Sequence, residues 1–350
     1  MNQKLIDVLT AVGKPVETYR APDGSGLLIL PYGGRLLGLY SPNSRENFYW
    51  THPVLESVAT ARAFYSSDQW HNSGGDRTWL APEADIFFPN FPNLGTYFQP
   101  RQLDPGNYVV TKVDGTIMLA HQLSLVLSRS KQNVAVEMSK SFGPAPNPLR
   151  HDRGWVGLAE LEYAGYTQFS TLVILGPNAV DVGPVGLWNL VQMPHDGELW
   201  IATHHRSEPC IIMGAIGCQD LHVGNHQIRY HMRAAGEHKL SVRATATTGR
   251  VGYLYQTGDR WALIVRNFFV NPSGEYIDPP WSNPEYLGFS VQACNVNSSL
   301  GSFSELEYHI PAIGRGTGRT RCDDASLVWA FRGPRESITT VARLLLGSEN

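Results

Sequence analysis

The stretch SELEYHIPAI, residues 304–313, decides the fold class because its apolar and polar residues alternate. Alternation is the period of a β-strand, in which successive side chains point to opposite faces. The apolar side would face a core, whereas the other side carries two carboxylates and an imidazole, from Glu305, Glu307 and His309. Exposed strand edges also carry charges, so this stretch by itself is equally compatible with a solvated face and a functional one.

Short segments of the same kind follow one another through most of the chain. They are separated by turn residues, and helices at βαβ spacing are missing from the pattern. Such strand series are typical of sandwiches and barrels, whereas alternating helices would indicate a parallel sheet. The strands that we predict are 26–30, 35–40, 107–112, 116–127, 132–140, 156–163, 168–175, 198–203, 209–214, 227–232, 239–245, 251–256, 260–270, 287–295, 302–310 and 326–332.

The remaining segments complete this architecture. Residues 3–12 carry an apolar stripe that predicts a short helix, and residues 113–115 form a turn of hairpin type. Residues 142–149 are too rich in proline for regular structure, and residues 337–346 fit a helix or a strand. No repeat or composition shift marks a domain boundary. We therefore expect an all-β fold, with one large antiparallel β-sandwich over residues 1–350 and a short N-terminal helix.

The composition is that of a folded protein and argues against several partners. Of the 350 residues, 42% are hydrophobic and 17% charged, which supplies a large core and too little charge for disorder. No basic stripe suggests nucleic acid as a partner. The N-terminus lacks the pattern of a secretory signal, and no apolar run reaches the ~18 residues of a membrane span. We expect a cytoplasmic protein with no membrane partner, and free thiols at its four cysteines.

A second polar cluster lies in GGDRTWLAPE, residues 74–83. The glycine pair lets the backbone approach a ligand closely, and Arg77 can donate two parallel hydrogen bonds to adjacent oxygens. Trp79 can stack on the apolar face of a pyranose. Two structural alternatives remain open, namely an ion pair of Arg77 with Asp76 or Glu83 that braces a loop, and an indole that fills the core. Carboxylate, guanidinium and aromatic face together are the parts that a sugar site needs.

A third cluster lies in WNLVQMPH, residues 188–195. Asn189 and Gln192 are neutral groups that pair well with hydroxyls, although asparagine and proline here are equally compatible with the end of a strand. Further along the chain, His204 and His205 are adjacent. Neighbouring residues on a strand point to opposite faces, so at most one of these histidines can reach a common site.

The sequence predicts neither a metal nor a cofactor. The chain has no GxSxG elbow, no P-loop and no dinucleotide fingerprint. A run of histidines has spacings of 4, 5 and 7, with no cysteine ligand and no helical pattern to place two imidazoles on one face. We interpret these as surface histidines: His222, His226, His231 and His238.

With these residues in view, the chain resembles the galactose mutarotase-like (aldose 1-epimerase) superfamily. LPYGGRLLGL at residues 30–39 is similar to that family's first hairpin, and Arg77 falls about where the family has an arginine that contacts sugar hydroxyls. Leu306-Glu307, followed by Pro311-Ala312, is similar to the Leu-Glu-Thr-Gln strand and following Pro-Asp that carry the family's catalytic base. The resemblance implies one large β-sandwich, a sugar substrate and Glu307 as the base.

The chain also departs from the family pattern. Alignment of Trp188-Asn189-Leu190 on the family's Asn-His-x-Tyr-Phe-Asn-Leu segment puts Val185 at the place of the acid histidine. The family's Leu-His-Gly-Gly turn has no counterpart around residues 97–101. The chain is therefore similar to a divergent branch, and another histidine would have to act as the acid. His309 shares the Glu307 face, and His204 or His205, at a strand end, is the alternative. A neighbouring carboxylate is expected to raise the pKa of the imidazole.

Three functions stay open at this point. The first is acid/base chemistry on a sugar, as in aldose 1-epimerases, in an isomerase with Glu307 as base and His309 and Arg77 as further catalytic residues. The second is a glycoside hydrolase, or a polysaccharide lyase, that uses the same cleft, with Glu83 or Glu305 as the second carboxyl of the hydrolase. The third is carbohydrate binding without catalysis.

The expected partner is a small-molecule sugar or an oligosaccharide, and the protein could be a monomer or a homodimer. The expected substrate-binding residues are Asp76, Trp79, Glu83, Trp188, Asn189, Gln192, His204 and Glu305.

Overall fold

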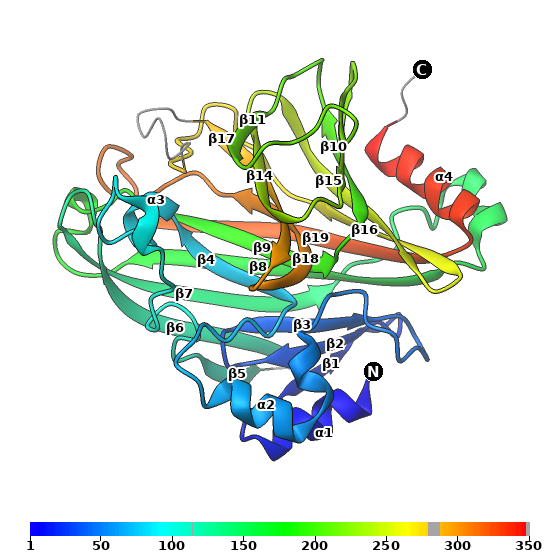
Figure 1. Ribbon diagram of the computed structural model, residues 1–350, viewed down its shortest axis with the longest axis horizontal. Coiled ribbons are helices and arrows are strands. Elements are labelled where there is room, and N and C mark those ends of the chain that lie inside the picture. Colours follow the sequence, from blue (N-terminus) through cyan, green and yellow to red (C-terminus); the bar gives the residue numbers. More distant parts are fainter. Residues whose placement is uncertain (114, 279–287, 348–350) are drawn as a thin grey trace.

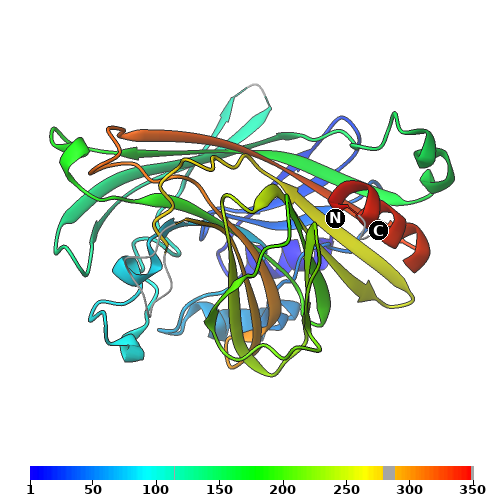
Figure 2. The same cartoon turned by 90° about the horizontal axis from the view of Figure 1, so that it is seen from above.

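The computed structural model describes residues 1–113, 115–278 and 288–347. Over these residues two large antiparallel sheets pack face to face, which confirms the predicted all-β sandwich (Figures 1 and 2). The nine-stranded sheet has the order β1 (Glu17–Arg20), β2 (Gly26–Leu30), β3 (Arg35–Tyr40), β4 (Asp76–Ala81), β9 (Gly186–Pro194), β18 (Gly301–His309), β17 (Phe289–Ser298), β14 (Gly236–Arg243) and β11 (Cys210–Met213).

The second sheet contains ten of the described strands. Its order is β12 (Leu221–Val223), β13 (Gln227–Met232), β10 (Gly197–Thr203), β15 (Thr247–Thr257), β16 (Arg260–Asn267), β19 (Arg321–Gly333), β8 (Glu162–Ile174), β7 (Asn133–Pro144), β6 (Thr116–Val126) and β5 (Val109–Val113). Most of the predicted strands have counterparts here. The pattern missed β1, β4, β9 and β12. Most of the predicted strand 156–163 precedes β8 and lies in a short helix and a turn. Residues 142–144, which we expected in a loop, instead continue β7.

Two of the sequence predictions touch residues outside the described part. Asp114, the centre of the predicted turn, lies there, and so does residue 287, the first of a predicted strand.

Helices cover outward faces of both sheets. The predicted N-terminal helix is α1 (Gln3–Ala11), in which the Asn2 side chain accepts a hydrogen bond from the Leu5 N–H and caps the first turn. Its buried residues pack on β2 and β3, next to α2 (Val58–Tyr65). Residues 337–346, which fitted helix or strand, belong to α4 (Arg335–Leu346), whose apolar side packs on the ten-stranded sheet. No helix in the described part of the chain has the length and apolarity to span a membrane.

The remaining helices are short and lie in connections. They are η1 (Pro53–Glu56), α3 (Glu83–Ile86), η2 (Leu94–Thr96), η3 (Arg153–Leu158) and η4 (Ala179–Asp181).

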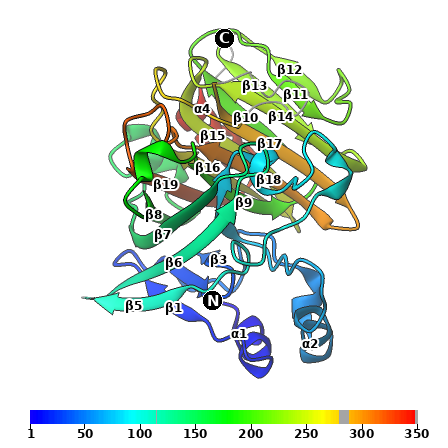
Figure 3. The ribbon, with the colours of Figure 1, turned by 90° about the vertical axis from the view of Figure 1, so that its left-hand side faces the viewer.

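Strand β18 occupies an inner position of the nine-stranded sheet, between β9 and β17 (Figure 3). Its alternation follows the sequence prediction. Leu306 and Tyr308 point to the ten-stranded sheet, where the Tyr308 ring stacks on Phe268 at 4.4 Å and its hydroxyl donates to Asp324 on β19. Residues on the other face of β18 therefore point away from the ten-stranded sheet.

A buried ion pair that involves Asp76 lies between the sheets. Its partner is not Arg77, the pairing that the sequence had left open. The Asp76 carboxylate on β4 pairs with Arg266 on β16 at 2.8 Å, with both side chains fully buried, and accepts a hydrogen bond from the Tyr166 hydroxyl at 2.6 Å. Asn189 on β9 also points inward, where Thr78 and Gln168 donate to its oxygen. The prediction that Asp76 and Asn189 bind substrate was therefore wrong, because strand alternation turns both toward the core.

Asp76→Asn should lower the free energy of unfolding by about 3–5 kcal/mol, because it leaves the Arg266 charge buried without its partner. Urea denaturation of the two proteins measures the loss. Asp323→Asn, which removes a carboxylate from an exposed pair with Arg321, is the matched control and should change stability very little. Equal losses in the two variants would contradict this role of the buried pair.

Candidate functional site

A cavity of about 260 Å³ lies on the face of the nine-stranded sheet that points away from the core. We call it the indole cavity, because Trp70, Trp79 and Trp188 line it. The other described residues around it come from β4, β14, β17, β18 and the segment 83–99, with single contributions from β11 and the β17–β18 turn. They are Arg77, Glu83, Phe88, Tyr97, Gln99, Met213, Glu237, Lys239, Cys294, Val296, Leu300, Phe303 and Glu305.

Strand register explains why distant parts of the sequence meet on this face. Directly paired residues of neighbouring strands point to the same side of a sheet. One row across four strands contains Gln192 of β9, Glu305 of β18, Cys294 of β17 and Lys239 of β14. The row beside it contains Glu307 of β18. The polar groups of four strands are thus gathered by pairing alone.

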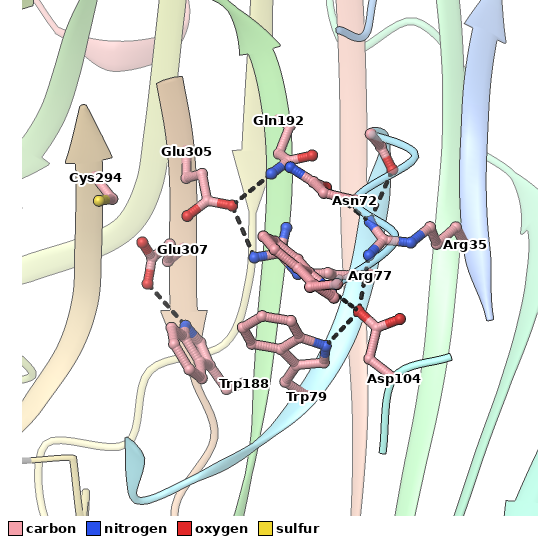
Figure 4. A network of polar contacts seen from close by, with 12 residues as sticks. Arg35, Asn72, Arg77, Trp79, Asp104, Trp188, Gln192, Cys294, Glu305 and Glu307 are labelled. Carbon is pink, nitrogen blue, oxygen red and sulfur yellow. Dashed lines mark hydrogen bonds and ion pairs between the residues drawn. The ribbon is translucent and has the colours of Figure 1, made fainter. Parts of the chain in front are cut away.

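The Arg77 guanidinium and the Glu305 carboxylate form the centre of the cavity floor (Figure 4). Arg77 Nη2 lies 2.8 Å from Glu305 Oε1, and the Gln192 amide donates to the same oxygen at 2.9 Å. The guanidinium also stacks on the Trp79 ring, 4.1 Å from its centroid. Arg77 Nε and Nη1 have no protein partner. Glu305 is 7% exposed and lines the cavity, so its carboxylate is within reach of a small ligand.

Glu307, the base that the family resemblance implied, is sealed beneath this floor. Its side chain is fully buried and is not among the described residues that line the cavity. The Trp188 indole N–H donates to its Oε2 at 2.8 Å (Figure 4). Lys239 Nζ lies 3.4 Å from the same atom. Burial raises the pKa of Glu307 to about 8, and the nearby Glu305 carboxylate adds to the increase against the opposing effect of Lys239.

Lys239 connects Glu307 to a second carboxyl of the cavity. Its ammonium lies 3.1 Å from Glu83 Oε2 and 4.5 Å from the centre of the Trp188 ring. Burial by itself would lower the pKa of Lys239, yet the carboxylates of Glu307 and Glu83 raise it well above its ordinary value. Burial also raises the pKa of Glu83. The attraction of Lys239 lowers this pKa again, but not enough to cancel the increase. Lys239 therefore carries a fixed positive charge within a ring of acids.

His309 does not have the properties of a general acid. It is buried, stacks on Trp188 at 5.5 Å, and is not among the described residues that line the cavity. Burial lowers its pKa to about 4, although Asp278 at 3.7 Å opposes this effect. The expected increase in the pKa of His309 was wrong, because loss of hydration outweighs the nearby carboxylate. His204 follows β10 in the ten-stranded sheet and is likewise absent from the described lining.

A buried carboxylate behind the cavity holds two of its indoles in place. Asp104 Oδ2 accepts the indole N–H of Trp70 at 3.0 Å and that of Trp79 at 3.1 Å, and it pairs with Arg35 at 2.7 Å (Figure 4). These contacts fix the orientation of both rings. Sequence reasoning missed Trp70, Asp104 and Lys239, which stand in no motif and come together through folding.

Among the described residues, three side chains approach one another with the spacing of a metal site. Cys294 Sγ and one oxygen each of Glu305 and Glu307 lie within 4.8 Å of one another. The two carboxyls already interact with Arg77 and Lys239, so a metal ion would have to compete with two buried cations. Burial also raises the pKa of the Cys294 thiol well above its usual value, which disfavours the thiolate that binds metals.

Comparisons with known proteins give distant structural similarity and no sequence match. No protein-family model matches the chain, and no curated protein sequence matches it. A galactose mutarotase related enzyme from Lactobacillus acidophilus is 7% identical, with a TM-score of 0.46 over 90% of this chain and 97% of that one. An aldose epimerase homologue from C. elegans is 8% identical, with a TM-score of 0.42 over 92% of this chain and 99% of that one.

A galactose 1-epimerase from Lactobacillus acidophilus is 7% identical, with a TM-score of 0.39 over 90% of this chain and 93% of that one. The names of all three describe mutarotases, epimerases or proteins related to them. The similarity is too distant to support a statement about activity. A proposal about activity has to be argued from the side chains of the cavity.

Glu307→Gln should remove a pH-dependent loss of stability. The unfolded chain releases the Glu307 proton near the ordinary glutamate pKa of 4.5, whereas the native protein keeps it until about pH 8. The native state binds more protons over this interval, so this residue makes the free energy of unfolding fall as the pH rises. Glutamine keeps the neutral form at every pH.

The difference in Tm between Glu307→Gln and the unmodified protein should therefore grow more positive from pH 5 to pH 8, as measured by calorimetry. Glu137→Gln on the ten-stranded sheet tests whether loss of any glutamate gives the same trend. A difference that is constant or shrinks with pH would contradict a protonated Glu307.

Proposed function

We propose that the protein is carbohydrate-active: it binds a sugar in the indole cavity and transfers protons at its anomeric centre, as an aldose 1-epimerase does. The observation that carries this proposal is the combination of three indoles with the Arg77–Glu305 pair in one small cavity. A pyranose has apolar faces made of C–H groups and a rim of hydroxyls. The half-buried Trp70 can contact these faces, whereas Arg77 and Lys239 each cover one face of the Trp79 and Trp188 rings. Charged groups form strong hydrogen bonds with the hydroxyls.

The volume and the carboxyls of the cavity also favour a sugar. At about 260 Å³ it is slightly smaller than the ~300–1,000 Å³ typical of small-molecule sites, which suits a single sugar ring. The carboxyls of Glu83 and Glu305 line the cavity and can accept hydrogen bonds from sugar hydroxyls. The cavity lining supplies both an apolar surface and specific polar anchors.

For catalysis we assign the base to Glu305 instead of Glu307. Glu305 lines the cavity and is ion-paired with Arg77, whereas Glu307 is sealed beneath it. Glu83 also lines the cavity, and its raised pKa suits a proton donor. Two carboxyls whose surroundings differ in this way are a recurrent basis for acid/base pairs.

The proposed reaction needs no other group. Glu305 takes the proton of the anomeric hydroxyl while Glu83 protonates the ring oxygen, and the bond between the anomeric carbon and the ring oxygen breaks to give the open aldehyde. Rotation and reversal of the two proton transfers close the ring with the opposite configuration.

A binding protein without turnover is the second candidate. It is favoured by the engagement of Glu305 Oε1 with both Arg77 and Gln192, which holds the carboxylate in place as a hydrogen-bond acceptor. The hydrolase alternative based on Glu305 and Glu307 has less support. These carboxyls come within 4.8 Å of each other, but the sealed position of Glu307 keeps it from flanking a glycosidic bond in the cavity.

Proton NMR of freshly dissolved α-anomers of common aldoses should show faster anomer exchange in the presence of the protein. Glu305→Gln should slow this exchange by about 10²–10⁴-fold, because a positioned base contributes that much. Glu83→Gln should also slow it, as a variant that leaves the Arg77–Glu305 pair intact. Glu137→Gln, on the other sheet, is the matched control and should exchange at the unmodified rate.

Saturation-transfer signals from the sugar, with no acceleration of exchange, would favour the binding protein over the enzyme. Full activity in Glu305→Gln would remove this residue from the mechanism. Absence of both binding and exchange for a broad panel of sugars would overturn the proposed function.

A further inference from the structure

A second and larger cavity lies directly beside the indole cavity. Its volume is about 410 Å³, and the described residues around it come from two segments, 68–71 and 98–105. We call it the side cavity. Trp70 and Gln99 line both cavities, so the two spaces meet at these side chains. The two spaces are therefore neighbours, with the Trp70 and Gln99 side chains as their shared boundary.

The wall between the two cavities is held rigidly. The Trp70 indole N–H donates to Asp104, which itself lines the side cavity and is paired with buried Arg35. The Trp70 ring also packs 5.5 Å from Trp79 and lies 5.3 Å from the Arg77 guanidinium. Asp104 thus lines the side cavity and at the same time orients the Trp70 ring that lines the indole cavity. The shapes of the two cavities therefore depend on the same carboxylate.

The chemistry of the side cavity suits hydroxyl groups and disfavours anions. Amide side chains of Gln69 and Gln102 line it, and each supplies both donors and an acceptor. Its guanidinium, from Arg101, already donates to the Asp68 carbonyl oxygen at 2.8 Å. The carboxyls of Asp68 and Asp104 line the same space, so it has no excess of positive charge. In the indole cavity, likewise, the described lining has two cations, Arg77 and Lys239, against the three carboxyls of Glu83, Glu237 and Glu305.

From this arrangement we propose that the two cavities are adjacent subsites for a neutral oligosaccharide, with one sugar in the indole cavity and the next in the side cavity. This inference rests on the proposed function and narrows its substrate class from a free monosaccharide to the end of a sugar chain. Trp70 stands between the two sugars and contacts both. The side cavity then contributes affinity and chain-length preference, while proton transfer stays in the indole cavity.

The test compares ligands of different length on the full chain. An array that carries monosaccharides together with neutral and acidic oligosaccharides first identifies the preferred glycan. Titration calorimetry then compares its terminal monosaccharide with the corresponding disaccharide. We expect the disaccharide to bind at least about tenfold more tightly, a difference of about 1.4 kcal/mol.

A variant that fills the side cavity provides the structural control. Gln102→Trp places a bulky ring there at an exposed position, and should reduce disaccharide affinity to that of the monosaccharide while monosaccharide affinity is unchanged. Gln256→Trp, an exposed glutamine on the ten-stranded sheet, is the matched control and should leave both affinities unchanged.

Each outcome separates this inference from the proposed function. Equal affinity for the monosaccharide and the disaccharide would overturn the second subsite and leave the proposed function intact. An unchanged disaccharide affinity in Gln102→Trp would do the same, and so would selective binding of acidic glycans. No binding to any glycan by the unmodified protein would overturn the proposed function and this inference with it.

Discussion

The inward face of strand β18 must be apolar to pack in the core, whereas the carboxyls on its outward face need charged or hydrogen-bonding partners. The rest of the site depends on both conditions. Its inward residues, Leu306 and Tyr308, are buried in the core between the sheets, where apolar contact stabilises the sandwich. Its outward residues are carboxyls that only a cation or a hydrogen-bond donor makes tolerable out of water. Other strands of the same sheet supply these partners: Trp188 comes from the adjacent β9, Arg77 from β4 and Lys239 from β14. The strand pairing that forms the core thus also places these charged side chains together on the floor of the indole cavity.

This floor has more carboxyls than cations, which affects the pKa values of the carboxyls. Lys239 lies between two carboxyls, and burial raises the pKa of both Glu83 and Glu307. Glu83, with its raised pKa, lines the cavity together with Glu305, which is paired with Arg77; the proposed acid and base roles rest on this difference in surroundings. Glu307 differs from both, because it is sealed beneath the cavity.

The aromatic wall depends on a different buried charge. Asp104 accepts hydrogen bonds from two indoles and is neutralised by Arg35, so the rings of Trp70 and Trp79 are fixed before any ligand arrives. Preorganised side chains lose little conformational entropy on binding, which favours a weakly anchored ligand such as a sugar. Because Trp70 also borders the side cavity, the same anchor sets the shape of both spaces.

The period of the side chains, read from the sequence, was sufficient for the all-β sandwich, for helix α1 and for the two faces of β18, because these follow from local alternation and amphipathicity. The same reasoning placed Arg77 and Glu305 among the candidate residues. It did not reveal that Asp76 points into the core or that His309 is kept neutral by burial.

Tertiary structure decided which acid faces the cavity. Glu305 and Glu307 are equivalent in the alternation of β18, and their difference arises from the strands, indoles and Lys239 that surround each. Solvent access and pKa depend on neighbours from β9, β14 and the segment 83–104, far away in the chain. Periodicity determines the side of a strand on which a residue lies, whereas burial depends on the long-range packing that covers that side.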